Sequence, residues 1–370
     1  QTDAAIALTG HNVNGNLAVT SAGAISQSAA LTVSGTSSFT STGSNNNITL
    51  STNSNALTGA VSASTVGSSG DITIDNGTTA LNLGTVTANG DLSIRGGNGI
   101  TDSGVITVSG TSLFHSDVTG KVITLDSTNA MTGAVSITHT GSANVAIDNG
   151  TTALNLGTVS VGQNFSATSG AVISDSGVIT VAGTATFVTD VNDIDIVLDS
   201  NNAITGAVTF TTQTSGSTNG ADITFDNGST AISLAAFTTE GNLTLQTDAA
   251  IALTGHTVNG NLAVTSAAAI SQSAALTVSG TSSFTSTGSN SNITLSTDSN
   301  SLTGAVSAST AGSSGDITID NGTRALNIGT LTANGDLSIR GGNGITDSGV
   351  ITVSGTSLFH SDVTGKVITL

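Results

Sequence analysis

The chain has 370 residues and a formal net charge of −18 at pH 7, with 46 Gly, no Pro, no Cys, no Trp and no Tyr. Five basic residues against 23 acidic ones argue against binding to nucleic acid, because such a surface repels phosphate. Without cysteine no disulfide can form. The sequence contains no run of about 18 consecutive apolar residues, so no membrane-spanning helix is predicted.

The first predicted elements are short strands near the amino terminus. Side chains alternate across a strand, so Leu17 and Val19 are expected to point inward, with Ala18 outward. The same reasoning places Ile25 inward, and in the run 31–33 it places the two apolar residues inward and Thr32 outward. The corners are expected to carry Gly, Asn, Asp and Ser, which accept the conformations of tight turns.

Similar runs continue along the chain, for example at 72–74 and 122–125. Val and Ile in alternation indicate strands, and the absence of Pro fits strands that have a neighbour on both sides. Only 8% of the residues are charged, which argues against disorder. Tandem immunoglobulin-like sandwiches are the alternative fold, but linker Pro and a core Trp or Tyr are missing.

Internal repetition is the strongest signal. Residues 1–125 recur at 246–370, an offset of 245, with nine differences. The six-residue run that starts at Leu31 returns at Ile106, Ile179, Leu276 and Ile351, which gives sub-units of 75, 73 and 97 residues. Two other short motifs recur together with this run, Thr-Gly-Ala-Val and Asp-Asn-Gly.

This repetition predicts an all-β solenoid, a parallel β-helix with about 19 residues per coil and roughly 20 coils in total. The spacing of 19 between Gly241 and Gly260, which begin similar runs, suggests this coil length. We therefore expect four coils in each shorter sub-unit and five in the longest. Residues 1–370 are expected to form one continuous rod, with one period at 1–245 and a partial one at 246–370.

Candidate chemical groups are few. His115 and Asp117, copied at His360 and Asp362, could suggest acid–base catalysis, but no nucleophile accompanies them, and an exposed loop is expected. A polysaccharide-processing enzyme would need an irregular site among basic residues, whereas the chain's basic residues all stand in repetitive context. These are Arg95, Lys121, Arg324, Arg340 and Lys366. We expect no enzyme, and no catalytic, cofactor-binding or metal site.

Three weaker signals concern ligands and modification. His11 and His139 stand alone and are expected to face solvent, since metal sites need clusters. The run 96–102 is similar to a calcium-binding nonapeptide, but Asp102 lies three residues after the last glycine and the motif requires two. A turn is therefore expected, and weak calcium binding stays open. Glycosylation sequons stand at Asn47, Asn76, Asn149, Asn164, Asn227, Asn242, Asn292 and Asn321, and Asp-Asn-Gly itself reads as a tight turn.

The segments 15–21, 25–33 and 34–39 together resemble filamentous-haemagglutinin-type repeats. This resemblance implies a right-handed β-helix on a large bacterial exoprotein that is exported by two-partner secretion through an outer-membrane pore. It also implies an adhesin that acts in biofilms or cell contact. The secretion domain of that family is not in this sequence, so export remains an expectation.

These observations lead to the expectation of a stiff shaft of a giant cell-surface adhesin, extracellular or secreted, that projects a binding tip. Its expected partners are cell-surface ligands such as glycans, or other cells. The alternative is a structural filament or sheath that associates with itself end to end or laterally, because open strand edges can pair. A β-helix enzyme acting on polysaccharides is the minor alternative.

Overall fold

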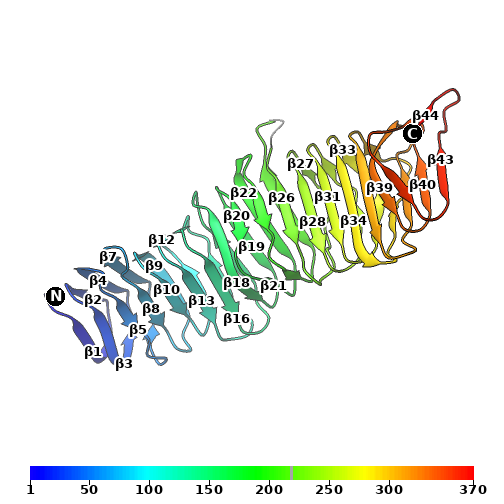
Figure 1. Ribbon diagram of the computed structural model, residues 1–370. Coiled ribbons are helices and arrows are strands. Elements are labelled where there is room, and N and C mark those ends of the chain that lie inside the picture. Colours follow the sequence, from blue (N-terminus) through cyan, green and yellow to red (C-terminus); the bar gives the residue numbers. More distant parts are fainter. Residues whose placement is uncertain (217–219) are drawn as a thin grey trace. The chain divides into compact units, whose positions relative to one another are not determined.

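The computed structural model describes residues 1–216 and 220–370, and every regular element in these ranges is a β-strand (Figure 1). Parallel strands stack as a β-solenoid of about 18 turns with about 20 residues per turn. The expected fold class is confirmed, although the turns are slightly longer and fewer than predicted. In the described ranges no helix is long and apolar enough to cross a membrane.

The chain divides into two compact units, Gln1–Asp190 and Val191–Leu370. Whether the rod is continuous over 1–370 stays a prediction. The strands that begin in the first unit are β1 (Ile6–Val13), β2 (Leu17–Ser21), β3 (Ile25–Val33), β4 (Ser37–Ser44), β5 (Ile48–Leu50), β6 (Ala56–Leu57), β7 (Val61–Val66), β8 (Ile72–Asp75), β9 (Leu81–Ala88), β10 (Leu92–Arg95), β11 (Ile100–Asp102), β12 (Ile106–Val108), β13 (Ser112–Ser116), β14 (Ile123–Leu125), β15 (Ala130–Met131), β16 (Val135–His139), β17 (Val145–Asp148), β18 (Leu154–Val161), β19 (Phe165–Ser169), β20 (Ile173–Asp175), β21 (Ile179–Val181) and β22 (Ala185–Asn192).

The second unit is built in the same way from short parallel strands. They are β23 (Ile196–Leu198), β24 (Ala203–Ile204), β25 (Val208–Gln213), β26 (Ile223–Asp226), β27 (Thr238–Thr239), β28 (Leu243–Thr247), β29 (Ile251–Thr254), β30 (Thr257–Val258), β31 (Leu262–Ser266), β32 (Ile270–Ala274), β33 (Thr277–Val278), β34 (Ser282–Ser289), β35 (Ile293–Leu295), β36 (Ser301–Leu302), β37 (Val306–Ala311), β38 (Ile317–Asp320), β39 (Leu326–Ala333), β40 (Leu337–Arg340), β41 (Ile345–Asp347), β42 (Ile351–Val353), β43 (Ser357–His360) and β44 (Ile368–Thr369).

Two ladders of parallel strands run through the first unit. Ladder I joins β3, β5, β8, β10, β13 and β16, and ladder II joins β2, β4, β7, β9, β11, β14, β17, β19 and β22. In ladder I, Ile72, Leu92 and Ser112 lie opposite one another. Each ladder therefore receives one strand per turn.

The repeats do not contain a whole number of turns. Ser37 starts β4 in ladder II. The residues that lie opposite it in the next three turns of this ladder are Val61, Leu83 and Asp102. The equivalent of Ser37 is Ser112, which starts β13 in ladder I, half a turn further on. The expectation of four turns per 75-residue sub-unit was wrong: the sub-unit makes about three and a half, and its motifs alternate between the two ladders.

The core lies between the ladders and consists of single apolar side chains stacked from turn to turn. Ile25 and Leu31 are completely buried, as expected, and Thr32 is exposed. Phe165 and Phe187 contact each other edge to face with 5.9 Å between ring centroids. Such a narrow core needs no Trp or Tyr, which explains the composition.

Glycine occupies a corner where consecutive turns touch through their backbones. The amide of Gly110 donates to the carbonyl of Gly90, and that of Gly90 donates to Gly70, both at 2.9 Å. A Cβ at Gly110 would lie 2.7 Å from the Gly90 backbone, closer than real Cβ atoms approach. A side chain at this corner would push the turns apart.

One turn is irregular. In three sub-repeats the strands β9, β18 and β39 hold a glycine whose Cβ would lie 2.4 Å or less from a serine hydroxyl of the preceding turn. Ala235 stands at the equivalent place in the longest sub-unit. There the eight-residue strand is reduced to an isolated bridge between Val208 and Leu234 and the two-residue β27. The methyl group of Ala235 thus stands where the other sub-repeats have no room for a side chain.

Candidate functional site

The most concentrated group of charged side chains lies at the ends of β8, β10 and β13. Parallel register places Asp75, Arg95 and His115 in one row, one residue from each of three successive turns. Asp117 follows β13 and lies beside the same row. The row forms because the motifs that end these strands all place a polar residue at the outward position.

Arg95 links the row. Its Nε donates to Asp117 Oδ2 at 2.7 Å, and its Nη1 lies 3.4 Å from Asp75 Oδ2. Nε2 of His115 lies 2.7 Å from Asp117 Oδ1. His115 therefore belongs to a strand and an ion-pair cluster, so the expectation of an exposed loop was wrong.

The charges of the cluster stabilise one another. The hydrogen bond from Arg95 lowers the pKa of Asp117 below its ordinary value, and the hydrogen bond to Asp117 raises the pKa of Arg95. About 30% of the Asp117 side chain and 48% of the Arg95 side chain remain exposed. Solvent therefore screens the pairs, and their contribution to folding is small.

The same cluster is present in the second unit. Arg340 Nη1 lies 2.8 Å from Asp320, its Nη2 lies 2.8 Å from Asp362, and His360 Nε2 lies 2.8 Å from Asp362. The hydrogen bond from Arg340 lowers the pKa of Asp362. Each copy links neighbouring turns of its own unit.

Within β13 the outer face beside the cluster carries Leu113 and His115 and no hydroxyl. Ser116 is the nearest hydroxyl in sequence, but it is buried on the inner face of β13, while His115 is on the outer face. Within residues 1–216 and 220–370 no group of three or more His, Asp or Glu residues is arranged to hold a metal ion. The geometry supports turn-to-turn cross-linking.

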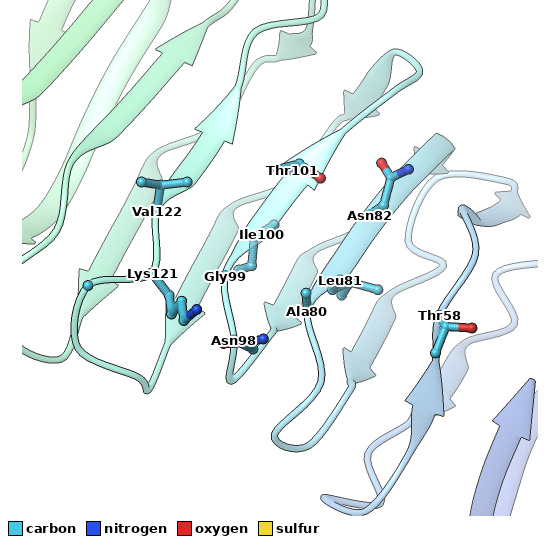
Figure 2. A pocket seen from close by; sticks show the side chains of 11 residues that line it. Thr58, Ala80, Leu81, Asn82, Asn98, Gly99, Ile100, Thr101, Lys121 and Val122 are labelled. Carbon is cyan, nitrogen blue, oxygen red and sulfur yellow. The ribbon is translucent and has the colours of Figure 1, made fainter. Parts of the chain in front are cut away.

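A shallow pocket lies beside the corner that precedes β9, β11 and β14 in the first unit (Figure 2). It has a volume of about 240 Å³ and is lined by three successive turns, at 80–82, 98–101 and 120–122, and by Thr58. Backbone hydrogen bonds of 3.0 Å fix these turns, from Leu81 to Gly99 and from Ile100 to Val122. Sequence reasoning missed this pocket because it arises only when the turns stack.

A second, polar cavity of about 550 Å³ lies in the second unit. Asp193, Asp195 and Asp222 are among its lining residues. Asp195 accepts the amide of Asp222 at 2.8 Å, and Asp222 accepts the amide of Asn242 at 2.7 Å. These two carboxylates already serve as links between turns.

The other polar residues singled out from the sequence have structural roles. Asp102 is buried and accepts the amide of Asp126 at 3.0 Å and the side chain of Asn129 at 2.8 Å. Burial raises the pKa of Asp102, and its hydrogen bonds hold the next turn. His139 is buried with its ring against the carbonyls of Lys121 and Gly141, so its expected exposure was wrong.

His11 is exposed as expected, but its copy is not. His256, 245 residues later, is buried, with its ring 4.9 Å from that of Phe237. Its Nδ1 has no hydrogen-bond partner in the described ranges. Burial lowers the pKa of His256 to about 4.

Half of the predicted glycosylation sequons are closed to modification. The asparagine of every Asp-Asn-Gly motif is completely buried: Asn76, Asn149, Asn227 and Asn321. Asn76 Oδ1 accepts the amide of Leu57 at 2.8 Å, and its Nδ2 donates to the carbonyls of Leu57 and Ala80. The side chain therefore replaces a strand by pairing with β6. Of the others, Asn47, Asn164 and Asn292 are exposed and Asn242 is half-buried.

A family described as repeats of unknown function (DUF5649) matches residues 1–64, 69–138, 142–211, 240–309 and 314–370. The chain belongs to this family. The DUF5649 repeats correspond to the sub-units seen in the sequence, since matches that start at 69, 142, 240 and 314 are separated by 73, 98 and 74 residues. The unmatched segment 212–239 contains the irregular turn at Ala235. Comparisons with curated proteins and with solved structures returned no match.

Proposed function

We propose that these DUF5649 repeats are a structural spacer, the stiff shaft of an extracellular, cell-surface adhesin that holds a binding tip away from the cell. The observation that carries the proposal is that the ion-pair cluster and the buried asparagine of the Asp-Asn-Gly motif both recur along the chain, and both connect one turn to the next. The Arg95 cluster and its copy at Arg340 do this at the surface. Asn76 and its three equivalents do it in the core.

The physical reasoning is that a solenoid lengthens without redesign. Each turn contacts only its neighbours, so a period can be copied while every local contact is kept. The 125 residues of the period that recur differ at nine positions, and Arg340 keeps both ion pairs of Arg95. An enzyme would need one irregular active site, whereas the turn-to-turn contacts of this chain recur in both copies of the repeat. Such recurrence favours a mechanical role.

Immunogold electron microscopy of intact cells, with antibody against one 245-residue period, tests this function. Gold along thin fibres that radiate from single cells is the expected result, with a strain that lacks the gene as the control. Gold over a continuous coat or along filaments between cells would favour the self-associating sheath instead. Gold confined to the cell interior would contradict an extracellular spacer.

A further inference from the structure

The shallow pocket beside β9, β11 and β14 has features that a spacer does not need. Its exposed apolar surface comes from Ala80 and Val122, while Leu81 and Ile100 are buried, and its rim carries the amides of Asn82 and Asn98 (Figure 2). Gly99 lies between them with φ of 103°, and a Cβ there would lie 3.0 Å from the carbonyl oxygen of Val122. Glycine therefore suits the left-handed backbone and the close packing of this corner.

The pocket is lined by one basic residue of an acidic chain. The chain has five basic residues, and Arg95 and Arg340 are each held by two aspartates. Lys121 lines the pocket and is exposed, and within the described ranges it belongs to no ion pair. Its ammonium group is available to a ligand.

The second unit repeats the residues of the site. All eleven lining residues recur unchanged 245 positions later, and the backbone hydrogen bonds from Leu326 to Gly344 and from Ile345 to Val367 have lengths of 3.0 and 3.1 Å, close to those of the first copy. One of the nine differences between the periods lies beside it, where Arg324 replaces Thr79. The carbonyl of Arg324 accepts the amide of Asn343, the counterpart of Asn98. Three of the five basic residues thus lie in or beside the two copies.

We propose that each copy of this pocket binds a carboxylate-bearing sugar residue of an acidic polysaccharide. The exposed Ala80 and Val122 suit the C–H face of a sugar ring, the amides on the rim suit its hydroxyls, and the lysine pairs with the carboxylate. A cavity of about 240 Å³ is smaller than a drug-sized site and fits a ligand of one ring. This binding is independent of the spacer role and could fail without affecting it.

Calorimetric titration of the whole 370-residue chain with tri-galacturonate, and with neutral maltotriose as the matched probe, tests the proposal. Saturable binding of tri-galacturonate at two sites is expected, with no measurable binding of maltotriose. The double variant Lys121→Gln, Lys366→Gln should weaken binding about tenfold or more, since a charged hydrogen bond is lost at each site. The double variant Lys121→Arg, Lys366→Arg keeps the charge and should keep most of the affinity.

The variant Arg324→Thr restores the residue of the first copy and should weaken only one of the two sites. Circular dichroism of every variant must match the parent chain, which the exposed positions of these side chains allow. Equal binding of both sugars, no binding of either, or unchanged binding in the Lys→Gln double variant would overturn the proposal. Equal competition by acetate would also overturn it, since the pocket would then recognise charge alone.

Discussion

Single residues of this chain have roles that depend on which turn covers them. His11 and His256 occupy the same place in the two periods, yet one is exposed and the other is buried against Phe237. The turn that carries Phe237 precedes the turn that carries His256 and packs against its ring. Local sequences that differ beside the histidine only at Asn12 and Thr257 thus accompany two environments, and the alternation pattern does not reveal which histidine is buried.

The buried imidazole of His256 makes stability depend on pH. In the unfolded chain a histidine binds a proton below about pH 6.5, whereas folded His256 does so only near pH 4. Between these values the unfolded state binds more protons, so acidification favours unfolding, by about 3 kcal/mol at most. Urea titrations of the parent chain and His256→Gln between pH 7 and pH 4 should show this loss in the parent only.

His11→Gln is the matched control, and because that side chain is exposed it should keep the full pH dependence of the parent. A parent chain and a His256→Gln variant with the same dependence on pH would contradict the assignment. Acidification also affects carboxylates such as Asp102, whose pKa is raised by burial. The difference between the two proteins isolates the histidine.

Asn76 provides a second test at the scale of one side chain. Asn76→Ala leaves the amide and carbonyl of Leu57 and the carbonyl of Ala80 without partners in or near the core. The expected loss in free energy of unfolding is about 3 kcal/mol, measured by urea denaturation. Asn12→Ala changes an exposed residue and should alter stability by no more than about 0.5 kcal/mol. Similar losses for both variants would refute the role of Asn76.

At the scale of strands and turns, much of the fold could be predicted. Alternation of apolar and polar residues identified the inward positions Ile25 and Leu31, and the absence of Pro was consistent with strands paired on both sides. The half-turn offset between Ser37 and Ser112 could not be predicted, because register depends on which turns stack. The burial of Asn76 was not predicted, because the Asp-Asn-Gly motif indicates a turn but not that the asparagine side chain bonds Leu57 of the preceding turn.

The corner glycines determine how closely turns approach. Gly110→Ala would place a Cβ 2.4 Å from Asp91 Oδ1 and 2.7 Å from the Gly90 backbone. The expected loss of stability is about 1–3 kcal/mol, with faster amide hydrogen exchange in β10 and β13. Gly15→Ala is the control, since no atom lies within 4 Å of its Cβ position. An unperturbed Gly110→Ala chain would show that the corners tolerate side chains.

For the whole molecule, the central claim is that the 245-residue period is a unit of length. A solenoid grows along its axis at about 4.8 Å per turn, whereas a compact domain grows in all directions. At about 20 residues per turn, one more period adds about 12 turns. The added length is then about 60 Å.

Small-angle X-ray scattering of the 370-residue chain, and of the same chain extended by one period, tests this claim most directly. We predict an unchanged cross-sectional radius and a maximum dimension longer by about 60 Å, which would also establish that residues 1–370 form one continuous rod. An increase in cross-section with little added length, or two bodies joined by a bend, would contradict a rigid shaft.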